Sequence, residues 1–397
     1  MPVRLRVLWL LRGDRRSASS RLQGYLIHDE LRKKHSDIIE SKLILAPPVW
    51  LYGESWDGAL CKKLAEGATG SIVVMQKLIG QEFAQLPRLI RAAGGKTVYV
   101  HCDYDPDNLI PFDCDAVVVT SRVLADWYIG HGHGVVKIIE DPNEFAWEAP
   151  APTREQTTRL IIGWIGHEMN WGTLDIVRQV LVEPEFADFQ LVTISNHPDA
   201  TLRWSPEIVK QTLREIDIGV IPVGRGIAAE AKSSNRATMF MGAGVPTIAG
   251  RIPAYEDLIR DGENGFLVGS AEDMRRSLRR LRSRRLREDM GRAGFCDVQQ
   301  RFTVDASAEK WIHLFRELGQ RLTPQTNSAR TALAEAEFEN AIAMRKLSWQ
   351  TGNCALARKY AVSAVHTAML HPNRKRIIRV CKAALYNVYR RMIKTKL

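Results

Sequence analysis

The chain has 397 residues, enough for two or three domains, and its hydrophobic content of 45% is ordinary for a globular protein. No apolar run approaches the roughly 20 residues that cross a bilayer, and the first residues do not form a signal peptide, so we expect a cytoplasmic protein. The six cysteines have no metal-type spacing and fit reduced thiols. A net charge of +11 predicts an anionic partner without choosing between a nucleotide, an anionic lipid and a nucleic acid.

The first expected elements are a buried strand, a polar loop and a helix. Val7–Leu11 is an apolar run of strand length, residues 12–20 are polar, and residues 21–34 carry leucines at helical spacing. This order opens a doubly wound domain, in which ligands lie beyond the carboxyl ends of the strands. The loop lacks the glycine-rich dinucleotide fingerprint, which argues against a dehydrogenase. Ser20 and Arg21 are candidates to hold a phosphate or an acceptor, and the alternative is a serine that only caps the helix.

Strands and helices then alternate, which predicts a mainly parallel sheet. We expect strands at residues 43–46, 71–75, 97–100 and 116–120, separated by helices at 56–66, 82–93 and 122–129.

The strand at 97–100 ends in a run of histidine and carboxylates, residues 101–107, which is the best candidate site in this domain. Asp103 and Asp105 have the spacing of a metal-binding pair, but we favour a role in positioning an acceptor, or in polarising it through His101. The remaining alternative is that these residues cap a strand and a turn.

A proline-rich segment, residues 149–153, predicts a semi-rigid linker to a second domain. Beyond it we expect a buried strand at 160–165, a tight loop at 166–170 and a helix at 173–181. Further strands are expected at 189–195 and 217–222, so the second half repeats the alternation of the first.

The stretch from Ala228 to Val268 begins with a charged run that leads into a short helix. Lys232 and Arg236 precede an apolar helix at residues 237–243, which Gly244 and the proline after it should end. The free N–H groups and the dipole of a helix start attract anions, so two cations beside it predict an anion site. The alternative is that both cations are solvated surface charges.

Four short motifs follow one another in this stretch. They are Lys-Ser-Ser-Asn-Arg at 232–236, Gly-Ala-Gly-Val-Pro-Thr-Ile-Ala at 242–249, Pro-Ala-Tyr at 253–255 and Asp-Gly-Glu-Asn-Gly-Phe-Leu-Val at 261–268. Their order and spacing resemble the donor-binding segment of group 1 (family 4) glycosyltransferases of the GT-B fold. Over roughly residues 4–320 the resemblance implies an α/β fold of two doubly wound Rossmann-like domains that face a cleft. It also implies transfer of a sugar from a nucleotide-sugar, with retention and without a metal or cofactor.

The resemblance further implies roles for individual residues. The donor-binding residues would be Gly166, His167, Asn170, Glu230, Lys232, Ser233, Asn235 and Arg236. Ser20, Arg21 and Asp103 would lie on the acceptor side, and His101, Lys232 and Arg236 would be catalytic.

One departure from the family concerns two glutamates that many members carry in this stretch. The matching positions here are Ala231 and Met239, and Glu230 does not satisfy the spacing. The missing pair leaves a non-catalytic nucleotide-sugar or glycan-binding protein as the alternative function.

Basic and helical segments follow the donor stretch. Residues 275–292 are dense in arginine and predict an amphipathic helical region with a solvated basic face, a lipid or nucleic-acid footprint being the alternative. Residues 306–318 predict another amphipathic helix, which in the resembling family packs back towards the first domain. Residues 373–397 hold nine basic residues and no acid, which suits an interfacial helix on an anionic membrane or a packed terminal helix.

We therefore divide the chain into an acceptor-side domain (1–150), a nucleotide-sugar domain (151–322) and a basic helical extension (323–397). The expected partners are a nucleotide-sugar and a glycan or lipid-linked acceptor, with peripheral membrane contact through residues 373–397. A nucleic-acid-binding protein is suggested by charge alone, and because no nucleic-acid motif is recognisable we expect no nucleic-acid partner.

Overall fold

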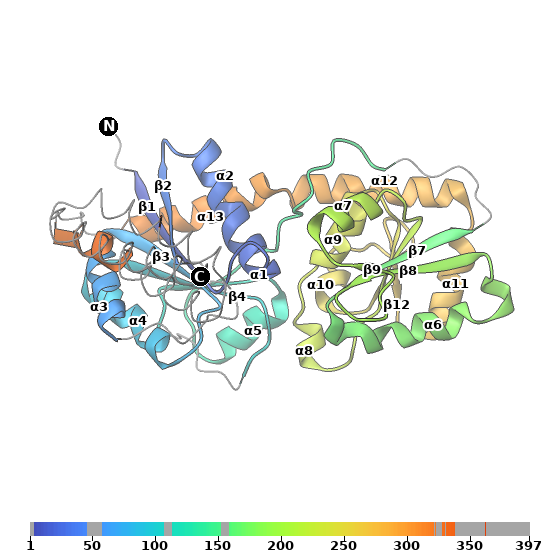
Figure 1. The fold of residues 1–397 in the computed structure, drawn as a ribbon, viewed down its shortest axis with the longest axis horizontal. Helices are drawn as coiled ribbons and strands as arrows, with labels where there is room; N and C mark the ends of the chain where they lie inside the picture. The colour runs from blue at the N-terminus through green and yellow to red at the C-terminus, as the bar shows by residue number, and fades with distance from the viewer. Residues whose placement is uncertain are drawn as a thin grey trace, which may run out of the picture.

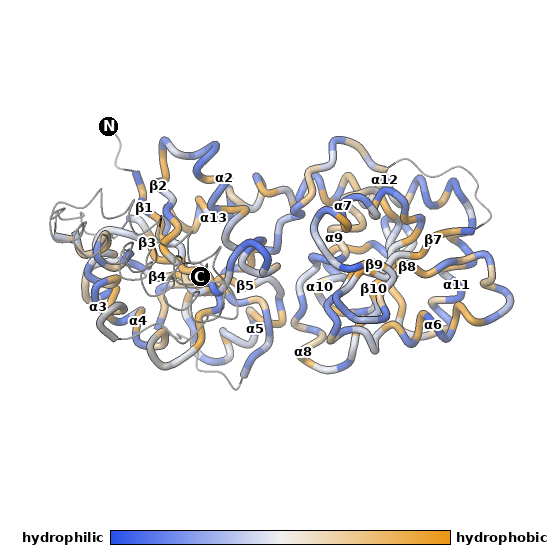
Figure 2. The backbone as a smooth tube through the Cα atoms, viewed as in Figure 1, coloured by the Kyte–Doolittle hydropathy of each residue, from blue (hydrophilic) through white to orange (hydrophobic). Residues whose placement is uncertain are grey.

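A computed structural model of the chain describes residues 4–45, 58–106, 113–151 and 159–320, together with residues 322, 328–329, 331–337 and 362. In this part, two six-stranded parallel sheets form two lobes that lie side by side (Figure 1). The strands are hydrophobic along most of their length and many of the loops are hydrophilic (Figure 2). Helices flank both sheets, so the predicted fold class is confirmed.

The first sheet has the strand order β2-β1-β3-β4-β5-β6. Its strands are β1 (Leu5–Leu11), β2 (Ile39–Leu45), β3 (Ser71–Gln76), β4 (Lys96–His101), β5 (Ala116–Val119) and β6 (Val136–Ile138). Its helices are α1 (Ala18–Ser20), a π-helical turn (Arg21–Tyr25), α2 (Leu26–Lys34), α3 (Gly58–Gly67), α4 (Gln81–Ala92) and α5 (Arg122–Gly130). The order reverses between β1 and β3, so their carboxyl ends form the switch point where such sheets bind ligands.

The second sheet has the order β12-β11-β10-β7-β8-β9. Its strands are β7 (Leu160–Ile165), β8 (Phe189–Ser195), β9 (Leu202–Arg203), β10 (Ile218–Ile221), β11 (Thr247–Gly250) and β12 (Phe266–Val268). Its helices are a 3-10 helix (Glu168–Leu174), α6 (Asp175–Leu181), a second 3-10 helix (Pro184–Phe186), α7 (Pro206–Thr212), α8 (Ile227–Glu230), α9 (Asn235–Gly242), α10 (Pro253–Glu256), α11 (Ala271–Leu281) and α12 (Arg284–Arg301). Its switch point lies between β7 and β10.

The stop signal predicted at Gly244 and the helical region predicted at 275–292 are confirmed, and one helix prediction is corrected. Gly244 adopts a φ of 77°, in the left-handed region that favours glycine, and α9 ends two residues before it. The helix expected at 173–181 is a 3-10 helix up to Leu174 and α-helical only after it. The helical region expected at 275–292 consists of two helices, because Ser283 caps a new helix by accepting a hydrogen bond from the Leu286 amide.

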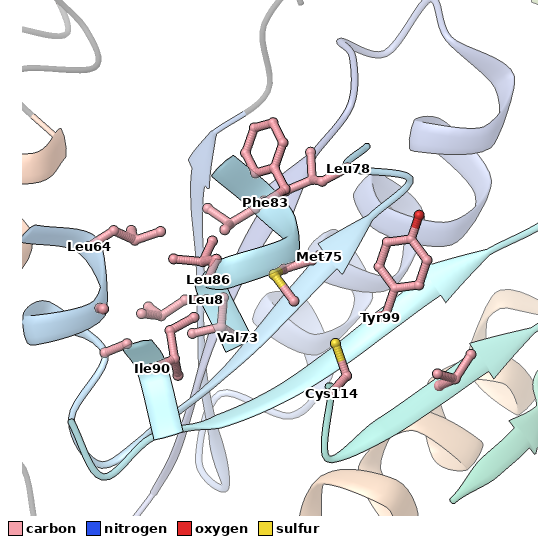
Figure 3. Close-up of a cluster of buried hydrophobic side chains, with 14 of the residues drawn as sticks. Leu8, Leu64, Val73, Met75, Leu78, Phe83, Leu86, Ile90, Tyr99 and Cys114 are labelled. Carbon is pink, nitrogen blue, oxygen red and sulfur yellow. The ribbon is translucent and has the colours of Figure 1, made fainter. Parts of the chain in front are cut away.

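Successive side chains of a strand point to opposite sides of a sheet, so each strand of the first sheet contributes to both of its faces. Both faces are buried in hydrophobic clusters. Figure 3 shows Met75, Phe83 and Tyr99 in the cluster on one face. Trp9 lies in the cluster on the opposite face.

The last long helix, α13 (Val304–Gly319), follows the second lobe in sequence but packs on the first (Figure 1). Trp311 meets Trp9 edge to face with 5.5 Å between ring centroids. Leu333, in the segment 331–337, is buried in the cluster of Figure 3. Apart from residues 328–329, 331–337 and 362, the predicted extension, including residues 373–397, lies outside the described residues. Across the described ranges, no helix combines the length and apolar character needed to cross a membrane.

Replacing Trp311 with alanine should lower the free energy of unfolding by about 3–5 kcal/mol, because it leaves a cavity against Trp9 in a well-packed core. Urea denaturation measures this change. His313→Ala is the matched control in the same helix. Its side chain is 76% exposed, so its effect should stay within about 0.5 kcal/mol. Equal effects of the two variants would contradict the packing of α13 on the first sheet.

Candidate functional site

The loop between β10 and α9 reaches from the second lobe to the first. Ala231 is fully buried among hydrophobic side chains of the first lobe, which include Leu124 and Tyr128. Its carbonyl accepts a hydrogen bond of 2.8 Å from the Ser121 hydroxyl. The loop is therefore held by both packing and a backbone contact.

Lys232, the next residue, forms an ion pair with Asp103 in the first lobe. The distance from Nζ to Oδ1 is 3.0 Å, and the other carboxylate oxygen accepts a hydrogen bond from Lys77. Burial alone would raise the pKa of Asp103, but the two lysines outweigh burial and hold this pKa far below its ordinary value. Asp103 is therefore charged near neutral pH.

Lys77 reaches Asp103 from the carboxyl end of β3. It is the one non-glycine residue with a positive φ (52°) among the described residues, and its side chain is only 12% exposed. A strained backbone conformation at a sheet switch point is typical of functional sites.

A chain of buried polar groups connects Ser20 to Ser233 of the second lobe. Ser20 Oγ donates to Gln76 Oε1 at 3.0 Å, and Gln76 Nε2 donates to Gln23 Oε1 at 3.4 Å. Gln23 Nε2 and Ser233 Oγ then donate to the two carboxylate oxygens of Asp141, at 3.0 and 2.7 Å. Burial raises the pKa of Asp141, although both hydrogen bonds oppose the increase. The hydroxyl of Ser20 is thus hydrogen-bonded to other groups of the protein.

Arg21 also makes internal contacts that join the lobes. Its guanidinium forms an ion pair with Glu144, with 2.6 Å between Nε and Oε2, and both side chains are buried. It also lies over the ring of Trp204 in the second lobe, 5.4 Å from the centroid. Glu144 and the Trp204 ring therefore balance the charge of Arg21 without any contact to an acceptor substrate.

His101 lies at the end of β4 and is fully buried. Its Nδ1 shares a hydrogen bond of 2.9 Å with the hydroxyl of Tyr128, whereas its Nε2 is buried without a partner. Burial, assisted by the charge of Lys77, lowers the pKa of His101 to about 4, so the ring is neutral at physiological pH.

The first turn of α9 carries two buried polar atoms without hydrogen-bond partners: Nη1 of Arg236 and Oδ1 of Asn235. Buried polar groups are nearly always bonded in folded proteins. Among the described residues, the turn thus holds one cationic donor and one acceptor that no group satisfies. They lie at the N-terminal end of a helix, where free N–H groups attract anions.

The loop after β7 uses its backbone amides internally. Gly166 N–H donates to the carbonyl of Ile194 at 3.2 Å, and a Cβ at Gly166 would come within 2.4 Å of the Trp164 ring. The His167 ring accepts a hydrogen bond from the Met169 amide at 3.2 Å. Of the predicted donor-binding side chains in this loop, His167 is exposed and Asn170 is half-buried.

The positions of the missing glutamates are apolar in the structure. Ala231 is buried in the first lobe, and Met239 is buried in the core of the second. Glu230 lies exposed at the end of α8. No carboxylate therefore stands at either family position.

Lys77, Asp141 and Trp171 were not among the predicted site residues; the ring of Trp171 stacks on that of His197, 4.1 Å away and nearly parallel. Lys77 follows the predicted strand 71–75, so the rule that sites gather at carboxyl ends of strands would have found it. His197 likewise follows the predicted strand 189–195. Asp141 and Trp171 do not directly follow a predicted strand and have no such local signal.

The arginines of α11 and the turn after it are ion-paired within the second lobe. Arg275 pairs with Glu183 at 2.7 Å, Arg279 with Glu185 at 2.7 Å and Arg282 with Asp188 at 2.9 Å. This face is therefore partly neutralised, as expected of a solvated surface.

Comparisons with known proteins bear on the fold of the chain and on its second lobe. Residues 174–313, which include the loop and α9, match the family model described as "Glycosyl transferase-like". HepE of Anabaena, solved with UDP and glucose, superposes with a TM-score of 0.58 at 11% identity, covering 79% of this chain and 100% of HepE. The chain has the GT-B fold, with a glycosyltransferase-like second lobe.

A second solved protein has the same overall fold. Sucrose-phosphate synthase of Thermosynechococcus elongatus has a TM-score of 0.57 at 12% identity, covering 80% of this GT-B chain and 99% of the synthase. The chain spans 58% of the length of TarM from S. aureus, and TarM covers 65% of this chain at 15% identity and a TM-score of 0.48. No curated protein shows significant sequence similarity to the chain.

Because His101 is buried in its neutral form, the protein should lose stability as the pH falls from about 6.5 towards 4. The folded state resists protonation of the ring, whereas the unfolded chain accepts the proton. Between pH 7 and pH 5 the wild type should lose about 2 kcal/mol more than His101→Gln, measured by urea denaturation. His28, whose pKa burial also lowers to about 4, remains in both proteins, so their difference isolates His101. Parallel pH profiles would contradict the buried neutral state.

Proposed function

We propose that this chain is a glycosyltransferase that moves a sugar from a nucleotide-sugar to a glycan, a lipid or another acceptor. Retention of configuration and independence of metal belong to the proposal through the family resemblance. The glycosyltransferase-like match over residues 174–313 and the GT-B fold support it.

The observation that carries the proposal is the first turn of α9. The unpartnered Nη1 of Arg236 suits an anionic oxygen, and the unpartnered Oδ1 of Asn235 suits a hydroxyl of a ribose or sugar. Lys232 precedes this turn and adds a second cation.

In the proposed reaction, Arg236 and Lys232 bind the diphosphate of the donor. As the bond to the sugar breaks, negative charge develops on the leaving diphosphate, and the two fixed cations stabilise it. The acceptor approaches from the first lobe beside Asp103. His101 is buried two residues before Asp103 and acts by positioning this segment.

Replacing both Lys232 and Arg236 with alanine should weaken the binding of a nucleoside diphosphate at least about tenfold, because both cations that face the diphosphate are lost. Isothermal titration calorimetry measures the affinity, beginning with UDP because HepE was solved with it. Arg251→Ala, which removes a half-exposed cation of the same lobe, is the control and should leave the affinity unchanged. Unchanged affinity in the double variant would rule out this site.

The absence of carboxylates at Ala231 and Met239 favours a second candidate, a non-catalytic protein that binds a nucleotide-sugar or a glycan. Thermal-shift measurements across a panel of nucleotide-sugars should identify a ligand that stabilises the fold. A hydrolysis assay with that ligand then separates the candidates. Turnover supports the transferase, and stabilisation without turnover, even with glycan and lipid acceptors added, supports the binding protein.

A further inference from the structure

The ammonium group of Lys232 has one partner in the structure and a different one in the proposed function. Its Nζ donates to Asp103 at 3.0 Å, across the junction of the two lobes. We propose that Asp103 is a positioning residue that holds Lys232 against the first lobe, and that the diphosphate of the donor competes with Asp103 for it. The inference rests on the proposed function, because it requires Lys232 to bind the diphosphate.

The competition follows from charge. A carboxylate and a diphosphate on one ammonium group are like charges a few ångströms apart, and they repel each other. Protonation of Asp103 would remove the repulsion, but Lys77 and Lys232 keep its pKa too low for that near neutral pH. The contact between Asp103 and Lys232 must therefore weaken as the diphosphate binds.

Lys77 determines which side of the contact moves. It also bonds to Asp103, and its side chain is 12% exposed compared with 44% for Lys232. Lys77 therefore keeps the carboxylate in the first lobe when Lys232 leaves. The movement is therefore expected in the loop of the second lobe, because Lys232 is the more exposed of the two lysines.

Arg236 gives the diphosphate a first contact that breaks no bond. It makes no ion pair among the described residues, and its Nη1 is unpartnered. A donor can bind Arg236 first and then draw Lys232 from Asp103. Donor binding and the contact between the lobes are then linked, and each weakens the other by the same factor.

The test is Asp103→Asn, which removes the charge and keeps the size of the side chain. Lys232 loses its competing partner, so a nucleoside diphosphate should bind about three- to tenfold more tightly in calorimetry with UDP, GDP and ADP. The gain should shrink as salt is added. Asp103→Glu should restore the wild-type affinity, a rescue that loss of packing would not produce.

Asp257→Asn is the matched control. Asp257 forms a different ion pair between the lobes, with Arg122 at 3.6 Å, and both side chains are half-exposed. Breaking it should leave diphosphate affinity unchanged, because it does not involve Lys232. Equal or weaker binding in Asp103→Asn than in the wild type would overturn the proposal.

Amide hydrogen exchange, measured without nucleotide, tests separately whether the contact between Asp103 and Lys232 restrains the loop. Asp103→Asn should speed exchange across residues 227–234, and Asp257→Asn should not. If the wild type binds none of the three diphosphates, the proposed function fails and the competition falls with it. If the wild type binds one of them but exchange is unchanged in Asp103→Asn, the proposed function stands and this inference alone is overturned.

Discussion

Two carboxylates of the first lobe, Asp103 and Asp141, hold the polar end of the loop that crosses from the second lobe. They bind consecutive residues of one loop, so that the loop is held by an ion pair at Lys232 and by a hydrogen bond from the hydroxyl of Ser233. Ala231, just before them, is buried among hydrophobic side chains of the first lobe. Polar contacts over a hydrophobic anchor fix the position of the loop more narrowly than packing alone, because hydrogen bonds are directional.

The two carboxylates differ in their electrostatic surroundings. Asp103 lies between two lysines, which keep it ionised. Asp141 is more deeply buried and has only neutral hydrogen-bond donors, so its pKa rises instead. The loop therefore contacts Asp103, which stays ionised, and Asp141, which accepts a proton more readily. Of the two, Asp103 is the stronger competitor of another anion for the loop.

The fold could be predicted from the sequence because its signals are local. Alternating strands and helices indicated the two sheets, and the four motifs between Lys232 and Val268 indicated GT-B. The roles of individual polar residues could not be predicted in the same way. Arg21 was expected on the acceptor side, yet its charge is balanced by Glu144, more than a hundred residues away in sequence. Such a pairing exists only in the folded chain and leaves no pattern around either residue.

The basic run after residue 275 illustrates the same limit on a surface. Its spacing indicated an amphipathic region, but the acids that pair with it, Glu183, Glu185 and Asp188, come about ninety residues earlier. Net charge counted along a segment therefore overstates the positive field at that surface. The formal charge of the whole chain is for this reason a poor guide to its partner.

The position of α13 has a consequence for synthesis of the chain. One face of the first sheet is completed by Trp311 and Phe315, which are made only after the whole second lobe. Chains emerge from the ribosome with the amino-terminal end first, and domains usually fold in that order. Here the continuous second lobe has all its described strands before the earlier lobe receives α13. The first lobe therefore exposes part of its apolar surface throughout translation of the second, and during that interval it needs protection from aggregation.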